Sequence, residues 1–129
     1  MQRYPFPYPN PAYTWNAEAF TKLLETAGLS MTFDITHLAQ VGEDITEFYR
    51  KNKERVINIH LSDFKKSWLN TNIHFPDHMH LSLGQGELPI EEFLKTLKKE
   101  NYKGLITMEI NSNLEGLCKS ANLIKKVIL

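Results

Sequence analysis

The chain has 129 residues, of which 42% are hydrophobic and 23% are charged, so it can bury one core and has no room for a second domain. Its 15 basic and 15 acidic residues cancel, which excludes the broad positive field on which sequence-independent nucleic-acid binding depends. No apolar run approaches the length of a membrane span, and the amino terminus does not have the pattern of a signal segment.

The first part of the chain predicts an arm, a helix, a strand and a second helix. Residues 4–11 read YPFPYPNP, and because proline fixes φ and removes a donor, we expect residues 1–15 to form an extended arm or loop. Asn16 is a helix-capping residue, Gly28 is a helix-ending residue, and the apolar positions between them have helical spacing: Phe20, Leu23, Leu24 and Ala27. A strand is predicted at 29–35, then a connection, then a short helix from Asp44 that uses Ile45, Phe48 and Tyr49.

The middle of the chain repeats the pattern of strand and helix. VINIHL at 56–61 predicts a strand, and the polar stretch 62–79 that follows is too long for an ordinary connection, so we expect it to be functional. A weaker strand is predicted at 80–83. After Gly84-Gln85-Gly86, a helix that starts at Pro89 is expected to bury its apolar positions, which are Ile90, Phe93, Leu94 and Leu97.

The chain ends with a strand at 105–110 and a helix with an apolar stripe: Leu114, Leu117, Cys118, Ala121 and Ile124. The single cysteine cannot form an internal disulfide, and its place in the stripe predicts a buried, inert thiol and fits a cytoplasmic location. Strands that are apolar on both faces and alternate four times with helices predict an α/β fold with a parallel sheet. Four βα units are half of a (β/α)8 TIM barrel, although the same periodicity allows a small open, flavodoxin-like sheet.

Three predicted strands end with a residue that can bind a metal ion: Asp34, His60 and Glu109. Because the carboxyl ends of parallel strands share one rim, we expect these side chains to converge. Two carboxylates and an imidazole suit Mn²⁺, Mg²⁺, Co²⁺ or Zn²⁺. Taken singly, Asp34 is equally explained as a helix cap and His37 as a partner of a backbone carbonyl. Glu109 differs, because an acid within an apolar strand needs a cation or a hydrogen-bonded partner.

These residues lie in three segments, SMTFDITH, INIHLSDF and HLSLGQGELPIEEFLKTLKKENYKGLITMEI. In this order they resemble the xylose isomerase-like TIM barrel superfamily (AP endonuclease family 2), which holds sugar isomerases and epimerases together with endonuclease IV. The resemblance covers residues 16–129 and implies the C-terminal half of the barrel domain. It also implies four earlier βα units in a full family member, the last ending in a glutamate that is both a metal ligand and a proton-transfer partner.

The resemblance implies roles for individual residues. Asp34, His60 and Glu109 match metal ligands, and Glu109 also matches a carboxylate that exchanges a proton with the substrate carbon. His37 matches a catalytic-site residue that contacts substrate in the isomerases or a further metal in the nucleases, and His80 matches a nuclease metal ligand. Asp63 and His78 are implied as substrate-binding residues.

The resemblance therefore implies a divalent-metal-dependent isomerase or epimerase for a sugar or sugar phosphate, active when an N-terminal half completes it. An abasic-site DNA endonuclease is the alternative, although His78-Met79 stands where the nucleases have Asp-Arg. A non-catalytic half-barrel remnant or subunit is the third possibility. Because a half-barrel leaves an inner face and two edges uncovered, we also expect an apolar exposed surface and a homodimer, or a separate N-terminal half as partner.

Overall fold

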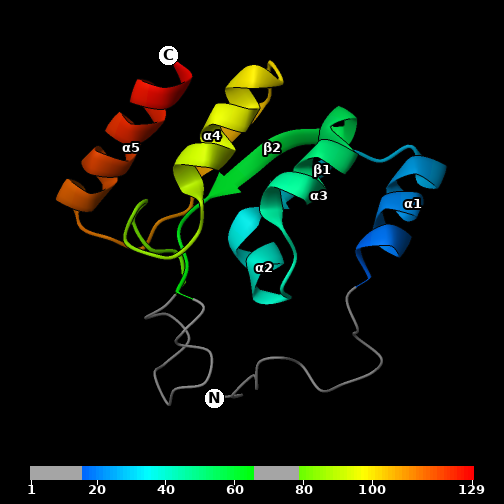
Figure 1. Ribbon diagram of the computed structural model, residues 1–129, viewed down its shortest axis with the longest axis horizontal. Helices are drawn as coiled ribbons and strands as arrows, with labels where there is room; N and C mark the ends of the chain where they lie inside the picture. Colours follow the sequence, from blue (N-terminus) through cyan, green and yellow to red (C-terminus); the bar gives the residue numbers. More distant parts are fainter. Residues whose placement is uncertain (1–15, 66–78) are drawn as a thin grey trace.

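The structure is a computed structural model that describes residues 16–65 and 79–129 (Figure 1). Predictions for the arm, for most of the long polar stretch and for His78 lie outside the described residues. The elements in chain order are α1 (Ala17–Ala27), β1 (Met31–Asp34), α2 (Ile35–Gln40), α3 (Ile45–Asn52), the 3₁₀ turn η2 (Lys53–Arg55), β2 (Val56–Leu61), α4 (Ile90–Lys99), β3 (Leu105–Met108) and α5 (Leu114–Ile128). The three strands form one parallel sheet in the order β1-β2-β3.

The predicted helix boundaries near the amino terminus are confirmed by their caps. The Asn16 side chain accepts a hydrogen bond from the Ala19 amide at 2.9 Å, and Gly28 ends α1 with a left-handed φ of 63°. The Asp44 side chain caps α3 by accepting from the Glu47 amide at 2.8 Å. A side-chain oxygen at these positions satisfies an amide that has no partner within the helix, so the local sequence is sufficient to begin both helices.

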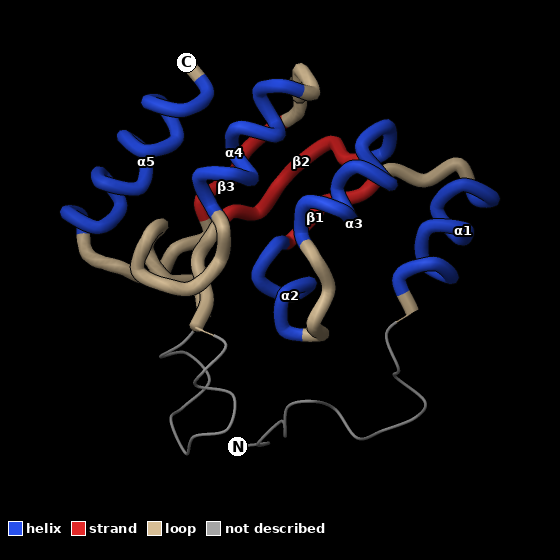
Figure 2. The backbone as a smooth tube through the Cα atoms, in the orientation of Figure 1, coloured by secondary structure: helices blue, strands red, loops and turns tan. Residues whose placement is uncertain are grey.

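The hydrophobic core lies between the sheet and the helices, which cover one face of the strands (Figure 2). Phe33 of β1 lies opposite Ile59 of β2, and Ile59 lies opposite Ile106 of β3. Phe33 and Ile59 are fully buried, and Phe33 packs against Phe48 and Phe93 at ring-centroid distances of 5.3 and 6.0 Å. This row of apolar side chains fixes the sheet against α3 and α4.

The other face of the sheet carries mainly polar residues. Because side chains alternate along a strand, the neighbours of the buried row point away from the helices. They are the register partners Asp34, His60 and Thr107 and, one row below, Thr32, Asn58 and Leu105. The expectation of an apolar uncovered face is therefore wrong for these strands, because only Leu105 in the two rows is apolar. The homodimer that rested on this expectation stays a prediction.

Two predicted elements differ in the structure. The strand predicted at 80–83 is wrong, because Leu81 forms only an isolated antiparallel bridge with Asp63, and His80 has a left-handed φ of 54° that ends any extended path. The connection predicted after β1 is instead the helix α2. Asp34 caps it by accepting from the His37 amide at 3.0 Å, and the helix buries Ile35 and Leu38.

The inward face of α5 also differs from its predicted stripe. Cys118 is exposed, so the prediction of a buried thiol is wrong, and Leu114 is 76% exposed. The residues that pack against the core or are buried lie mainly further along the helix: Ser120, Leu123, Ile124, Val127 and Ile128. Because α5 packs against α4, the position of α4 decides which side of α5 is covered. Among the described residues, no helix is both long enough and apolar enough to cross a membrane.

Candidate functional site

Asp34, His60 and Glu109 meet at the carboxyl ends of β1, β2 and β3, on the uncovered face of the sheet. One ligand atom from each side chain lies within 4.8 Å of the other two. His60 Nδ1 is 2.9 Å from Glu109 Oε2 and 3.8 Å from Asp34 Oδ2. The exposed fractions of the side chains are 19% for Asp34, 33% for His60 and 46% for Glu109, so the cluster is open to solvent on one side.

The two oxygens of Asp34 have different tasks. Asp34 ends β1 and caps α2, and its Oδ1 accepts the hydrogen bond from the His37 amide. Its Oδ2 lies 3.8 Å from His60 Nδ1 and 3.8 Å from His37 Nε2. The capping role and the ligand role therefore do not compete, because the cap orients the carboxylate and leaves the second oxygen facing the cluster.

Glu109 reaches the cluster because the ladder of β2 and β3 continues one residue beyond β3. Its backbone amide donates to the Leu61 carbonyl at 3.1 Å, which keeps the alternation of side chains in step with His60. The carboxylate therefore projects from the uncovered face, away from the apolar core. The sequence requires a partner for this acid, and in the structure that partner is His60.

His37 and His80 lie beside the cluster. Their rings meet edge to face with centroids 5.7 Å apart, and His37 is 55% exposed. His80 Nδ1 lies 3.1 Å from the Glu109 carbonyl oxygen. A carbonyl oxygen can only accept a hydrogen bond, so Nδ1 of His80 is the donor in this contact. Among the described residues, His80 is not part of the group whose ligand atoms converge.

Asp63, for which the resemblance implied substrate contact, has no exposed surface. Its two carboxylate oxygens accept four backbone hydrogen bonds at 2.8 to 3.1 Å, from the amides of Phe64, Gly84, Gly86 and Leu88. In this structure the side chain belongs to the framework of the loop after His80. Substrate contact by Asp63 stays a prediction.

Two residues near the cluster were missed in the sequence. Thr36 and Ser62 are buried, and their hydroxyl oxygens lie 2.7 Å apart, which ties the end of β1 to the end of β2. Ser62 Oγ also lies 3.4 Å from His80 Nδ1. Each hydroxyl stands two positions after a candidate ligand, Asp34 or His60, just beyond the end of β1 or β2. A polar residue at the same place after two successive strands is the signal that indicates them.

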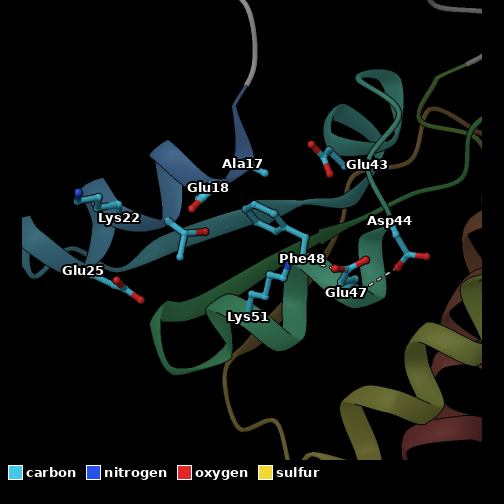
Figure 3. A pocket seen from close by; sticks show the side chains of 10 residues that line it. Ala17, Glu18, Lys22, Glu25, Glu43, Asp44, Glu47, Phe48 and Lys51 are labelled. Carbon is cyan, nitrogen blue, oxygen red and sulfur yellow. Dashed lines mark hydrogen bonds and ion pairs between the residues drawn. The ribbon is translucent and has the colours of Figure 1, made fainter.

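A separate groove of ≈ 600 Å³ lies between α1 and α3 (Figure 3). Five of its lining residues are acidic and two are basic: Glu18, Glu25, Glu43, Asp44 and Glu47 against Lys22 and Lys51. Lys51 pairs with Glu47 at 2.9 Å, and this hydrogen bond raises the pKa of Lys51. None of the residues of the strand-end cluster lines this groove.

Comparisons with known proteins identify the family of the chain. The family described as xylose isomerase-like TIM barrel matches residues 5–127. An uncharacterized protein of Methanocaldococcus jannaschii is 30% identical over 110 residues, covering 83% of this chain and 34% of that protein. An inosose dehydratase of Mesomycoplasma hyopneumoniae is 29% identical over 103 residues, covering 71% of this chain and 34% of that enzyme. An inosose dehydratase of Clostridium perfringens is 28% identical over 110 residues, covering 74% of this chain and 37% of that enzyme.

A solved structure leads to the same fold. The crystal structure of a D-tagatose 3-epimerase-like protein matches with a TM-score of 0.64 and 25% identity, over 88% of this chain and 40% of that one. These matches confirm the predicted TIM-barrel fold and not the alternative, a small flavodoxin-like sheet. The chain spans about a third of the length of the curated relatives that it matches.

Proposed function

Because this chain belongs to the xylose isomerase-like TIM barrel family, we propose that its strand-end cluster binds a divalent metal ion for isomerase- or epimerase-like proton transfer on a sugar or sugar phosphate. The observation that carries the proposal is the convergence of Asp34, His60 and Glu109 ligand atoms within 4.8 Å. The similarity to an inosose dehydratase and to a D-tagatose 3-epimerase-like protein supports polyhydroxylated carbonyl compounds as the substrate class.

The donor set fits a small divalent ion. Carboxylate oxygens and an imidazole nitrogen are ligands for Mn²⁺, Mg²⁺, Co²⁺ or Zn²⁺, and no thiolate is among them. Three protein ligands leave coordination positions open, which suits an ion that also contacts substrate. When bound, the ion would polarise the carbonyl and hydroxyl oxygens of the substrate.

The side chains have distinct tasks in the proposed reaction. The Glu109 carboxylate removes the proton from the carbon beside the carbonyl, and the electron pair of that C–H bond moves to form an enediolate. Return of a proton to the opposite face of the same carbon gives the epimer, and return of a proton to the neighbouring carbon gives the isomer. His37, with an exposed side chain beside Asp34, is placed to hydrogen-bond a substrate hydroxyl. The further carboxylate that the resemblance implies is expected to be needed for turnover.

Dehydration is a second candidate, because inosose dehydratases match more than two thirds of this chain. Removal of the same proton followed by loss of a hydroxyl from the next carbon would use the same Glu109. The two reactions are distinguished by the product, because only dehydration changes the substrate mass by one water. Cleavage of abasic DNA remains the lesser alternative, since basic and acidic residues cancel in the chain.

Calorimetric titration with Mn²⁺ tests the metal site. We expect His60→Ala and Glu109→Gln each to weaken binding by at least about tenfold, because each removes a direct ligand. Glu54→Gln is the matched control: it makes the same chemical change at an exposed residue in η2, at the opposite end of β2. Identical titrations for the wild-type protein and His60→Ala would contradict the proposal.

The proposed partners are a small sugar or sugar phosphate and either a second copy of the chain or a separate N-terminal half. Size-exclusion chromatography with light scattering tests the second copy, because a stable monomer at micromolar concentration would contradict a homodimer. The cytoplasmic location stays a prediction.

A further inference from the structure

The loop that replaces the predicted strand is organised around one carboxylate. Among the described residues, Asp63 is the only acidic or basic side chain in the buried core. Its Oδ1 accepts from the amides of Phe64 and Leu88, and its Oδ2 accepts from the amides of Gly84 and Gly86. Its backbone amide and carbonyl also bond with Leu81, at 2.9 and 3.0 Å. The segment 81–88 is thus fastened to the end of β2 along its length.

His80 connects this loop to the cluster of Asp34, His60 and Glu109. The residue precedes Leu81 and has a φ of 54°, a conformation that a residue with a side chain keeps only when its surroundings hold it. Its Nδ1 contacts the Glu109 carbonyl at 3.1 Å, and its own carbonyl accepts from the Asn111 amide at 2.7 Å. His80 therefore holds the backbone on both sides of residue 110, directly beside the carboxylate that meets His60.

We propose that Asp63 is a positioning residue for the cluster, acting through the 81–88 loop and His80 to orient Glu109; its effect on metal binding rests on the proposed function. The chemistry of the contact requires a carboxylate. Four amide donors need four acceptor positions, and an asparagine side chain has one oxygen and would turn its own donors toward two of the amides. The close approach of the loop to this carboxylate also requires a glycine at position 86, because a Cβ there would lie 2.6 Å from Asp63 Cγ.

A second tie of the same loop provides a matched control. The Leu83 amide donates to Ser120 Oγ at 3.0 Å, and this hydroxyl donates to the Gly116 carbonyl at 2.8 Å, which joins the loop to α5. This contact holds the loop only at Leu83, whereas the Asp63 carboxylate holds it at three amides and the Asp63 backbone bonds with Leu81, the residue after His80. A purely structural role for Asp63 would make Asp63→Asn and Ser120→Ala alike, whereas a positioning role separates them.

NMR spectroscopy of the metal-free full chain makes the first comparison. In Asp63→Asn we expect the His80 ring nitrogens to lose the pattern of a proton fixed on Nδ1. We also expect the Asn111 amide to exchange at least about tenfold faster, because its hydrogen bond depends on the position of His80. Ser120→Ala should leave both signals as in the wild-type protein. If Asp63→Asn fails to fold, Gly86→Ala displaces the loop with Asp63 intact and should give the same two changes.

Titration with Mn²⁺ makes the second comparison. We expect Asp63→Asn to weaken binding by about 10- to 100-fold, the range found for groups that orient metal ligands, and Ser120→Ala to change it less than about threefold. A folded Asp63→Asn or Gly86→Ala variant with wild-type His80 and Asn111 signals would overturn the positioning role, as would the same changes in Ser120→Ala. If the wild-type protein binds no Mn²⁺, the proposed function fails, and the metal-free spectra still decide the role of Asp63.

Discussion

The two faces of the sheet are built from neighbouring residues and differ in what they do. Phe33 and Ile59 point into the layer under α3 and α4, where they are buried almost completely. The next residue along each strand, Asp34 or His60, points the opposite way and remains partly exposed. Because side chains alternate, a shift of one residue separates packing from chemistry. The covered face is expected to carry stability, and the uncovered face to carry the metal site.

The largest effect on stability is expected from Phe33→Ala, which removes a ring that is 1% exposed. The free energy of unfolding should fall by about 3–5 kcal/mol, because the substitution loses buried apolar surface and leaves a cavity among the aromatic rings. Urea denaturation followed by circular dichroism measures it. A loss below about 1 kcal/mol would mean that the packing of the helices does not depend on the buried apolar side chains of the strands. It would contradict the assignment of stability to the covered face.

A smaller effect is expected from raising the pH, through Tyr102 in the covered layer. Burial raises the pKa of Tyr102 to about 12, from 10.0, and its hydroxyl donates to the Leu105 carbonyl at 2.9 Å. The unfolded chain loses this proton at a lower pH than the folded chain, so the contribution is complete below about pH 10 and is lost as the pH rises through about 12.

The loss should be on the order of 1 kcal/mol, because Tyr102 is only partly buried and solvent weakens the effect. Urea denaturation at a series of alkaline pH values measures it. Tyr102→Phe has no proton to lose, so its stability should fall less over the same interval. Equal slopes for the two proteins would show that other groups cause the alkaline loss.

The smallest effect is expected from Thr107→Val on the uncovered face. Thr107 lies opposite His60 and donates to Asn58 Oδ1 at 3.1 Å, in an exposed position. Valine keeps the shape and favours a strand, so the free energy of unfolding should change by less than about 0.5 kcal/mol. The same denaturation experiment applies. A loss above about 1.5 kcal/mol would show that the uncovered face also stabilises the sheet, which would contradict the division of tasks between its two faces.

Much of the fold was readable from short stretches of sequence. The cap at Asn16, the helix that starts near Asp44, the strand at 56–61 and the buried face of α4 all formed as predicted. The three cluster residues were identified because each stands where a predicted strand ends. The inward face of α5 was not readable, since its apolar residues allow more than one stripe and α4 selects between them.

Spacing within about ten residues determined the capped helices, the strands and the residues of the cluster, because capping and alternation act between near neighbours. Only the tertiary structure decided the contacts of Asp63 and His80. Asp63 bonds to amides up to 25 positions away, and His80 bonds to a carbonyl 29 positions away. Such contacts depend on where the chain returns after its loops, so a buried carboxylate that holds a loop and one that meets a substrate have the same local sequence.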